Sequence, residues 1–174
     1  MKKTIICLSV LFLSVSFIGK KCDQNDTCKD VLKNSDYLRK DSLWGKINNK
    51  DYVVYEIMHN ENETDRFLLL SINNKFTCNH NSLLNTNDYQ GYSTNYIRKE
   101  KDGFSFSIEY GSRYYYNYEF YFKFENNKFY LKKMSETTFD KANPKESGSK
   151  NKKMKMIKSK ISFEKFNIHN YISE

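Results

Sequence analysis

Apolar and polar side chains alternate most clearly over residues 114–134, with the sequence YYYNYEFYFKFENNKFYLKKM. Side chains of a β-strand point to opposite faces with a period of two. The even positions from 114 to 124 are all aromatic, whereas the odd positions mix tyrosine with asparagine, glutamate and lysine. This stretch therefore predicts a strand with one apolar face, followed by a second strand that pairs with it.

The dipeptide Asn126-Asn127 predicts the hairpin turn, because asparagine tolerates the positive φ that a type I′ turn requires. The register set by this turn pairs opposite charges, Glu125 with Lys128, and apolar residues, Phe124 with Phe129 and Phe122 with Leu131. On the outer face it pairs Lys123 with Tyr130 and Tyr121 with Lys132. It fails where Phe120 would face Lys133. We expect the pairing to end or to bulge there.

Similar turn sequences recur along the chain, centred about 25 to 28 residues apart, at 46–50, 71–75, 99–103 and 124–128. Each joins two strand-like runs, which predicts four hairpins in sequence. The strands expected are 42–47, 52–59, 66–72, 75–79, 92–99, 104–110, 114–125 and 128–139.

These elements predict a mainly β (β or α+β) fold, an antiparallel meander of about eight strands that forms either an open curved sheet or a barrel. A short N-terminal helix is expected within 28–39, and its role would be to pack on the sheet. Alternation over 104–110 indicates a sheet with one solvated face, whereas the continuous apolar run 67–70 indicates a central strand covered on both sides. We expect one β-rich domain over 20–174.

The N-terminus is typical of a secretory signal peptide, expected over 1–19. Two lysines precede an apolar run over 5–18, in which Ser14 and Ser16 suit the positions before a cleavage site. The mature protein would be periplasmic or secreted, with no transmembrane segment after cleavage. A lipoprotein is less favoured, because Cys22 follows two lysines rather than small residues.

Export permits disulfide bonds. Cys22 and Cys28 are close in sequence and form the expected pair, which leaves Cys78 single. Cys78 and His80 raise two alternatives, a metal site and the catalytic groups of a small envelope hydrolase completed by the loop 79–91. A structural zinc site needs four ligands, so we expect no metal.

The net charge of +8 is concentrated in residues 141–160, which carry +7. One interpretation is a polyanion contact with nucleic acid, anionic lipid or acidic glycan. The other is a solvated lysine-rich loop, 141–153, that leads into a last strand over 154–163. The run holds neither arginine nor aromatic residues, so the loop is favoured and no nucleic-acid partner is expected.

No sequence motif indicates catalysis or a cofactor. The chain has no glycine-rich phosphate loop, no G-x-S-x-G, no H-E-x-x-H and no paired C-x-x-C, and its three histidines stand far apart. We therefore expect no cofactor and favour a protein that is not an enzyme.

The polar face of the 114–134 hairpin is the candidate contact surface. Tyrosine combines an apolar body with a polar tip and is enriched at interfaces. The candidate binding residues are Tyr115, Tyr121, Lys123, Tyr130 and Lys132. The alternative is that a helix or the C-terminal segment covers this face.

The block 118–134, followed by 135–139 and by KISFEKFNI at 160–168, resembles the C-terminal half of small exported proteins of Gram-negative bacteria that have no named function. The resemblance covers about the last third of the chain. It implies a periplasmic or secreted β-rich protein, and some such proteins are immunity factors against toxins delivered into the periplasm. The favoured function is thus an exported, non-catalytic protein that binds another protein or an envelope component, as an inhibitor or immunity factor does.

Overall fold

The computed structural model describes the chain except for residues 1–23, 63–64, 85–88, 90, 144–151 and 173–174. The expected signal peptide, Cys22 and most of the expected lysine-rich loop lie outside the described residues.

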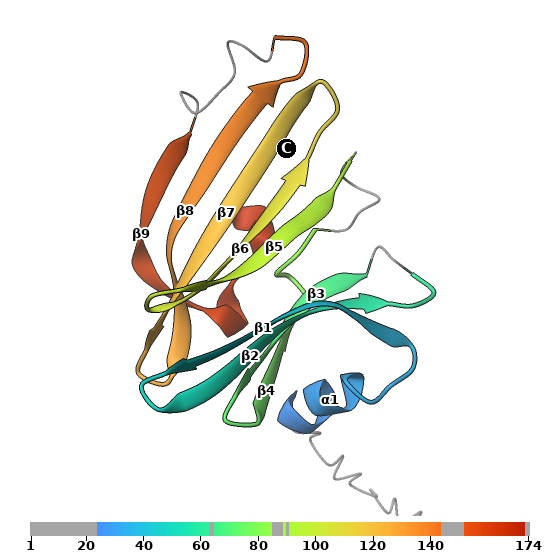
Figure 1. The fold of residues 1–174 in the computed structure, drawn as a ribbon, viewed down its shortest axis with the longest axis vertical. Coiled ribbons are helices and arrows are strands. Elements are labelled where there is room, and N and C mark those ends of the chain that lie inside the picture. Colours follow the sequence, from blue (N-terminus) through green and yellow to red (C-terminus); the bar gives the residue numbers. More distant parts are fainter. Residues whose placement is uncertain (1–23, 63–64, 85–88, 90, 144–151, 173–174) are drawn as a thin grey trace, which may run out of the picture.

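One short helix precedes nine strands in the described part of the chain (Figure 1). The elements are α1 (Gln24–Val31), β1 (Tyr37–Ile47), β2 (Lys50–His59), β3 (Arg66–Ile72), β4 (Lys75–Asn79), β5 (Ser93–Glu100), β6 (Gly103–Tyr110), β7 (Tyr114–Glu125), β8 (Lys128–Asp140) and β9 (Lys153–Ser162), followed by the 3-10 turns η2 (Phe163–Lys165) and η3 (Ile168–Asn170). The predicted mainly β meander is confirmed. It forms two open antiparallel sheets, β1-β2-β3-β4 and β5-β6-β7-β8-β9, rather than a barrel.

The predicted asparagine turns have the expected backbone. Asn126 and Asn127 have φ values of 50° and 63°, and the pairs at 48–49 and 73–74 are also left-handed. This conformation matches the type I′ turn that suits the twist of a hairpin. The Asn-Asn pairs therefore end β1, β3 and β7 and set the register of the strands that follow.

The register of the β7–β8 hairpin is confirmed up to Phe122 and Leu131, and the bulge comes one position earlier than expected. Tyr121 pairs with Lys133, not with Lys132, and Phe120 pairs with Met134. The extra residue on β8 lets Met134 reach the core beside Phe120 and keeps the lysines away from it. Burial of one more apolar side chain thus decides where the bulge forms.

Aromatic rings fill the space where the inner faces of the two sheets meet. Phe104 stacks on Phe122 with ring centroids 5.2 Å apart, and Tyr52 of the first sheet meets Phe129 of the second at 5.1 Å. The other buried aromatic members of this cluster are Phe106, Tyr110, Tyr118, Phe120, Phe124, Phe163 and Phe166. The even face of β7 from Tyr118 onward is therefore core, as the alternation predicts.

The C-terminal segment packs on this inner face. Phe163, Phe166 and Ile168 are each at most 1% exposed, and Phe166 lies 5.3 Å from the Phe122 ring. Asn79 holds the segment in place, because its Nδ2 donates to the carbonyl oxygens of Phe163 and Phe166 at 2.6 and 2.8 Å. The segment therefore completes the core and lies on the side of the sheet opposite the candidate contact surface.

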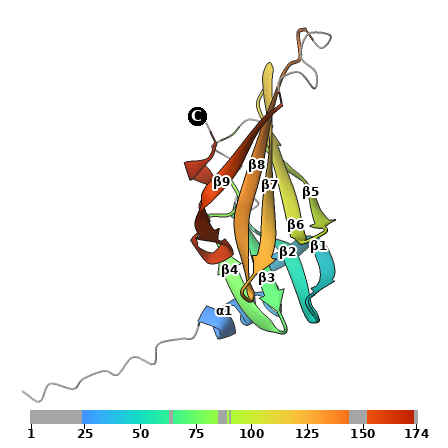
Figure 2. The same ribbon diagram turned by 90° about the vertical axis from the view of Figure 1, so that its left-hand side faces the viewer.

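A second, smaller core lies on the other face of the first sheet. Helix α1 lies beside β4 there (Figure 2). Phe67 and Leu69 face this core, whereas Leu68 and Leu70 face the main one, which confirms that β3 is covered on both sides. The helix begins and ends earlier than the expected 28–39, since its last residue is Val31 and strand β1 starts at Tyr37.

The disulfide expected between Cys22 and Cys28 is wrong, because the structure bonds Cys28 to Cys78. The two residues are 50 positions apart, but α1 packs against β4 and brings their Cα atoms to 5.6 Å. Sequence proximity favoured the wrong partner. Packing of the helix on the sheet selects the right one.

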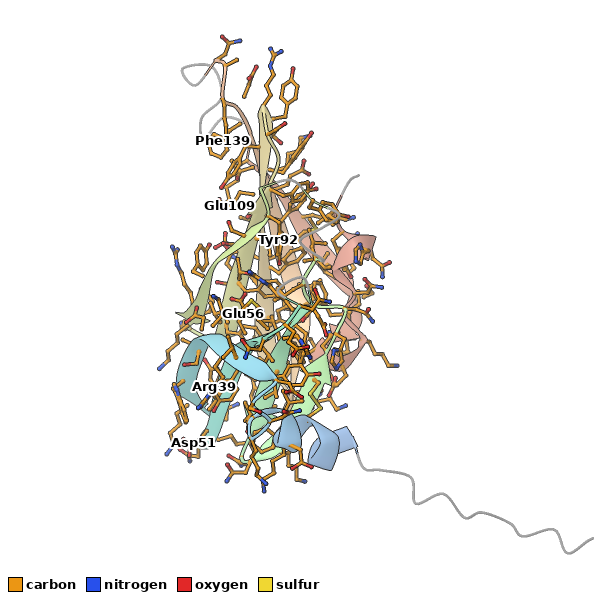
Figure 3. The ribbon with its side chains drawn as sticks, turned by 90° about the vertical axis from the view of Figure 1, so that its right-hand side faces the viewer. Arg39, Asp51, Glu56, Tyr92, Glu109 and Phe139 are labelled. Atoms are coloured by element: carbon orange, nitrogen blue, oxygen red, sulfur yellow. A yellow bond between two sulfur atoms is a disulfide. The ribbon has the colours of Figure 1, made fainter. Side chains whose placement is uncertain are left out.

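A buried carboxylate lies where the first sheet meets β5 (Figure 3). Glu56 is 4% exposed and forms an ion pair with Arg66 at 3.6 Å. Burial raises the pKa of Glu56, although the charge of Arg66 on β3 opposes the effect. The buried charge of Glu56 is therefore compensated by an arginine of the neighbouring strand in the same sheet.

Removal of the disulfide should destabilise the fold without changing it. We expect the double substitution Cys28→Ala and Cys78→Ala to lower the free energy of unfolding by about 2–4 kcal/mol, because the bond restricts the unfolded chain. Urea unfolding of the mature chain measures this loss. A reductant should reproduce it in the wild type and leave the variant unchanged; equal stability of the two proteins would contradict the assignment.

Candidate binding surface

The second sheet turns one face away from the aromatic core, and we call this the outer face. Strand register places its side chains in rows that run across the sheet. One row contains Arg98, Ser105, Tyr121, Lys133 and Met156, and the next contains Tyr96, Ser107, Glu119, Ser135 and Met154. The described helical segments pack elsewhere, α1 on β4 and the C-terminal turns on the inner face. None of them covers the outer face.

The structure brings three of the five predicted binding residues into one shallow pocket of about 200 Å³ on this face. Its lining residues are Glu100, Lys101, Asp102, Tyr121, Lys123, Lys132 and Lys133. Tyr130 pairs with Lys123 beside the pocket. Tyr115 is six residues from Tyr121 along β7, about 20 Å away, and lies instead against Phe139.

Cations lie over the tyrosine rings of the outer face. The Arg98 guanidinium is 3.6 Å from the centroid of the Tyr96 ring, and Lys133 Nζ is 3.9 Å from that of Tyr121. Lys160 lies 5.7 Å from the ring of Tyr130. A cation at this distance is attracted by the negative face of the ring. The outer face therefore carries positive charges that are held in place by cation–π contacts with tyrosine rings.

Glu125 holds two of the predicted lysines in place. Its carboxylate forms ion pairs with Lys132 at 3.0 Å and Lys123 at 3.4 Å. The hydrogen bond from Lys132 is the main reason why the pKa of Glu125 lies below its usual value. By contrast, neither Lys101 nor Lys133 has an ion-pair partner within the described part of the chain. These two lysines are the cations best able to meet a partner's carboxylates.

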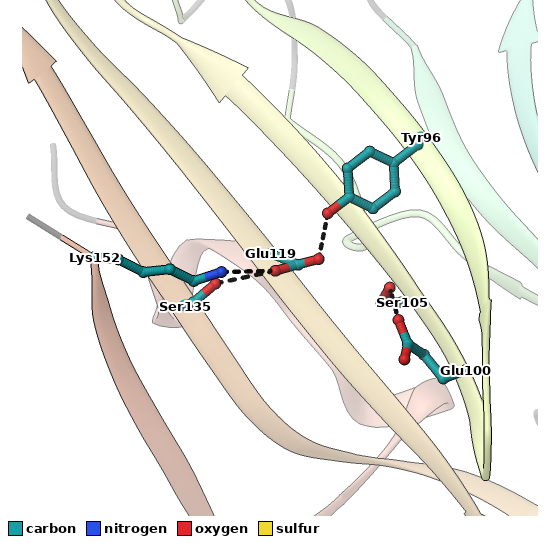
Figure 4. Close-up of polar contacts among 6 residues, drawn as sticks. All are labelled: Tyr96, Glu100, Ser105, Glu119, Ser135 and Lys152. Carbon is teal, nitrogen blue, oxygen red and sulfur yellow. Dashed lines mark hydrogen bonds and ion pairs between the residues drawn. The ribbon is translucent and has the colours of Figure 1, made fainter. Parts of the chain in front are cut away.

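A buried glutamate lies at the centre of the outer face (Figure 4). Glu119 is 7% exposed, and its carboxylate accepts hydrogen bonds from the Tyr96 hydroxyl, from Ser135 Oγ at 3.3 Å and from Lys152 Nζ at 3.4 Å. The alternation over 114–134 puts Glu119 on the polar face of the hairpin, but it does not indicate what this residue does. Its partners come from three other parts of the chain, so only the strand register could have revealed them.

The contacts of Glu119 also decide its ionisation. Burial raises the pKa of Glu119, but hydrogen bonds from Tyr121 and Tyr96 and the charge of Lys152 outweigh burial, so the pKa lies below its ordinary value. Burial and the same hydrogen bond raise the pKa of Tyr96 to about 12. At neutral pH, Glu119 is thus an ionised carboxylate whose tyrosine partners are neutral. These contacts hold the side chains next to Tyr121 in place.

The hydrolase alternative depended on a Cys78 thiolate. With its sulfur bonded to Cys28, Cys78 offers no thiolate, and the His80 ring packs on Phe67 with centroids 4.1 Å apart. No group of three or more His, Cys, Asp or Glu side chains that could hold a metal occurs among the described residues. The nucleophile that this alternative requires is therefore absent from the disulfide-bonded form.

The lysine-rich strand β9 forms one edge of the second sheet. Its lysines are 153, 155, 158 and 160, all exposed. Lysine on an edge strand prevents pairing with a strand of another molecule. This role accounts for the described part of the basic segment without a polyanion ligand.

Comparison with protein-family models gives no match, and neither do comparisons with curated proteins and with solved structures. The resemblance to small exported proteins remains a prediction. Within the described residues, no helix is long and apolar enough to span a membrane.

The carboxylate of Glu119 should make a measurable, pH-dependent contribution to stability. Its folded pKa lies below the ordinary value of 4.5, so the stabilisation is present above that pH and is lost as the pH falls through the folded pKa. We expect Glu119→Gln to cost about 1–3 kcal/mol at pH 7. The difference from wild type should narrow between about pH 5 and pH 3.

Urea unfolding at pH 7, 5, 4 and 3 tests this expectation. Glu61→Gln is the matched control, because Glu61 lies exposed in the turn after β2. A difference between wild type and Glu119→Gln that stays constant or widens at low pH would contradict the proposed charge network.

Proposed function

We propose that this chain is an exported, non-catalytic binding protein that engages an acidic surface of another protein through the outer face of its second sheet. The observation that carries the proposal is the pocket in which Tyr121 lies among Lys101, Lys123, Lys132 and Lys133. The two acidic side chains that also line it, Glu100 and Asp102, would restrict the partner's carboxylates to defined positions.

The sheet supports this function as a rigid platform. The Tyr121 hydroxyl interacts with the Glu119 carboxylate, and Lys133 Nζ lies over the Tyr121 ring. The Tyr121 side chain therefore has little conformational freedom left to lose on binding. Tyrosine held in this way is a common energetic centre of protein interfaces. Lysines at the edge of the pocket would mainly accelerate association and select acidic partners.

Export is supported by two observations. The N-terminal sequence is typical of a signal peptide, and a disulfide between Cys28 and Cys78 persists in oxidising compartments such as the periplasm. A non-catalytic protein with one charged, rigid face acts by occupying its partner, as an inhibitor or an immunity factor does.

Affinity capture from the native envelope fraction tests the proposal, with the mature chain from residue 20 as bait. We expect the double substitution Tyr121→Ala and Lys133→Glu to weaken capture at least about tenfold, since it removes the aromatic centre and reverses one charge. Raising the salt concentration should weaken wild-type capture in the same direction.

The matched control is Tyr114→Ala with Lys75→Glu. It makes the same chemical changes at exposed positions outside the pocket and should leave capture intact. Thermal unfolding confirms that each variant is folded. Equal capture by the pocket variant and the wild type, with both folded, would overturn the proposal.

A further inference from the structure

A larger cavity of about 670 Å³ opens on the first sheet, at the end carrying the turns that follow β1 and β3. It is lined by Trp44, Gly45, Lys46, Asp51, Tyr52, Val53, Ser71, Asn73 and Asn74. Small-molecule sites in proteins have volumes of about 300–1,000 Å³. The cavity thus has the size of a ligand site, and it lies on a different sheet from the outer face.

Trp44 is the single tryptophan of the chain, and it is 67% exposed. Strand register places it in one row with Val53 and Ser71, so these side chains share one face of the sheet. The ring also meets Tyr55 edge to face, with centroids 6.2 Å apart. One edge of the indole is therefore supported by the sheet, while most of its surface is left open beside the cavity.

The rim of the cavity is polar and balanced in charge. Lys46 pairs with Asp51 across the β1–β2 hairpin, and both are exposed. Asn73 and Asn74 come from the turn after β3. A carboxylate accepts hydrogen bonds in several directions, and an amide both accepts and donates them. One lysine and one aspartate favour a ligand with many hydroxyl groups over a strongly charged one.

The cavity is built on fixed backbone rather than on loose loops. The backbone N–H of Asp51 donates to Asn73 Oδ1 at 3.0 Å, and that of Asn73 donates to the Asp51 carbonyl at 2.9 Å, so the two turns are joined. Glycine is required at position 45, because a Cβ there would overlap the Tyr52 ring. The Tyr52 hydroxyl in turn donates to the Gly103 carbonyl at 2.8 Å.

From these features we propose that the Trp44 cavity binds a saccharide. The C–H groups on one face of a pyranose ring carry partial positive charge and pack on the negative face of an indole. Hydroxyl groups at the edge of the same sugar would bond to Asp51 and to the amides of Asn73 and Asn74. Trp44 would supply most of the contact area with the sugar, and hydrogen bonds from the polar rim would fix the orientation of the sugar ring. This site is independent of the protein-binding function proposed for the outer face.

Because the chain has one tryptophan, fluorescence excited at a wavelength that tyrosine does not absorb reports on this cavity. The mature wild-type chain is titrated with cellotetraose and with chitotetraose, and binding is confirmed by calorimetry. We expect a saturable change in Trp44 emission with at least one of the two. Calorimetry should show at least tenfold weaker binding for Trp44→Ala and several-fold weaker binding for Asp51→Asn.

Tyr114→Ala is the matched control, since Tyr114 is also exposed, at 52%, but lies on the second sheet. It should bind as the wild type does, and circular dichroism should show that every variant is folded. The proposal is overturned if neither oligosaccharide gives a saturable signal or if Trp44→Ala binds with unchanged affinity.

Discussion

The packing of phenylalanine rings between the two sheets decides which surfaces this protein has left for function. Phe104 contacts both Phe122 and Phe129, and Phe163 of the C-terminal segment packs against Phe104 and Phe122. Burying one such side chain stabilises the fold by about 1.5–3 kcal/mol. The C-terminal segment therefore packs on the inner face, and the opposite face of the second sheet is left without cover from the described helical segments.

Polar side chains at the centre of the outer face, such as Ser135 and Glu119, are buried among larger neighbours, and this constraint explains the Glu119 network. Glu119 would be costly to bury alone, but hydrogen bonds and Lys152 hold it as a carboxylate. The network joins β7, which carries Tyr121, to Tyr96 of β5 and Ser135 of β8. The first sheet also presents an aromatic side chain. There, Gly45 packs closely on the Tyr52 ring, and the neighbouring Trp44 lines a cavity. Each sheet thus presents one aromatic side chain on a rigid support.

Local patterns predicted much of this fold, and contacts between distant residues account for what they missed. The Asn-Asn turns and the alternation of β7 depend on neighbours in sequence, so their prediction succeeded. The bulge at Lys132 was misplaced by one position because it depends on the core position of Met134. The partner of Cys28 and the contacts of Glu119 depend on how helix and strands meet, which periodicity does not encode. The Trp44 cavity was missed for the same reason, because it needs three adjacent strands.

No described helical segment covers the outer face of the second sheet, which displays the lysines around Tyr121. Amine-selective acetylation of the folded mature chain, followed residue by residue with mass spectrometry, tests this most directly. We expect rapid modification of exposed Lys101 and Lys123, at rates similar to that of exposed Lys75 on the first sheet, and slower modification of Lys132 and Lys133, because both are half-buried. Protection of all four pocket lysines in the isolated chain, at a concentration where it is monomeric, would show that this face is covered.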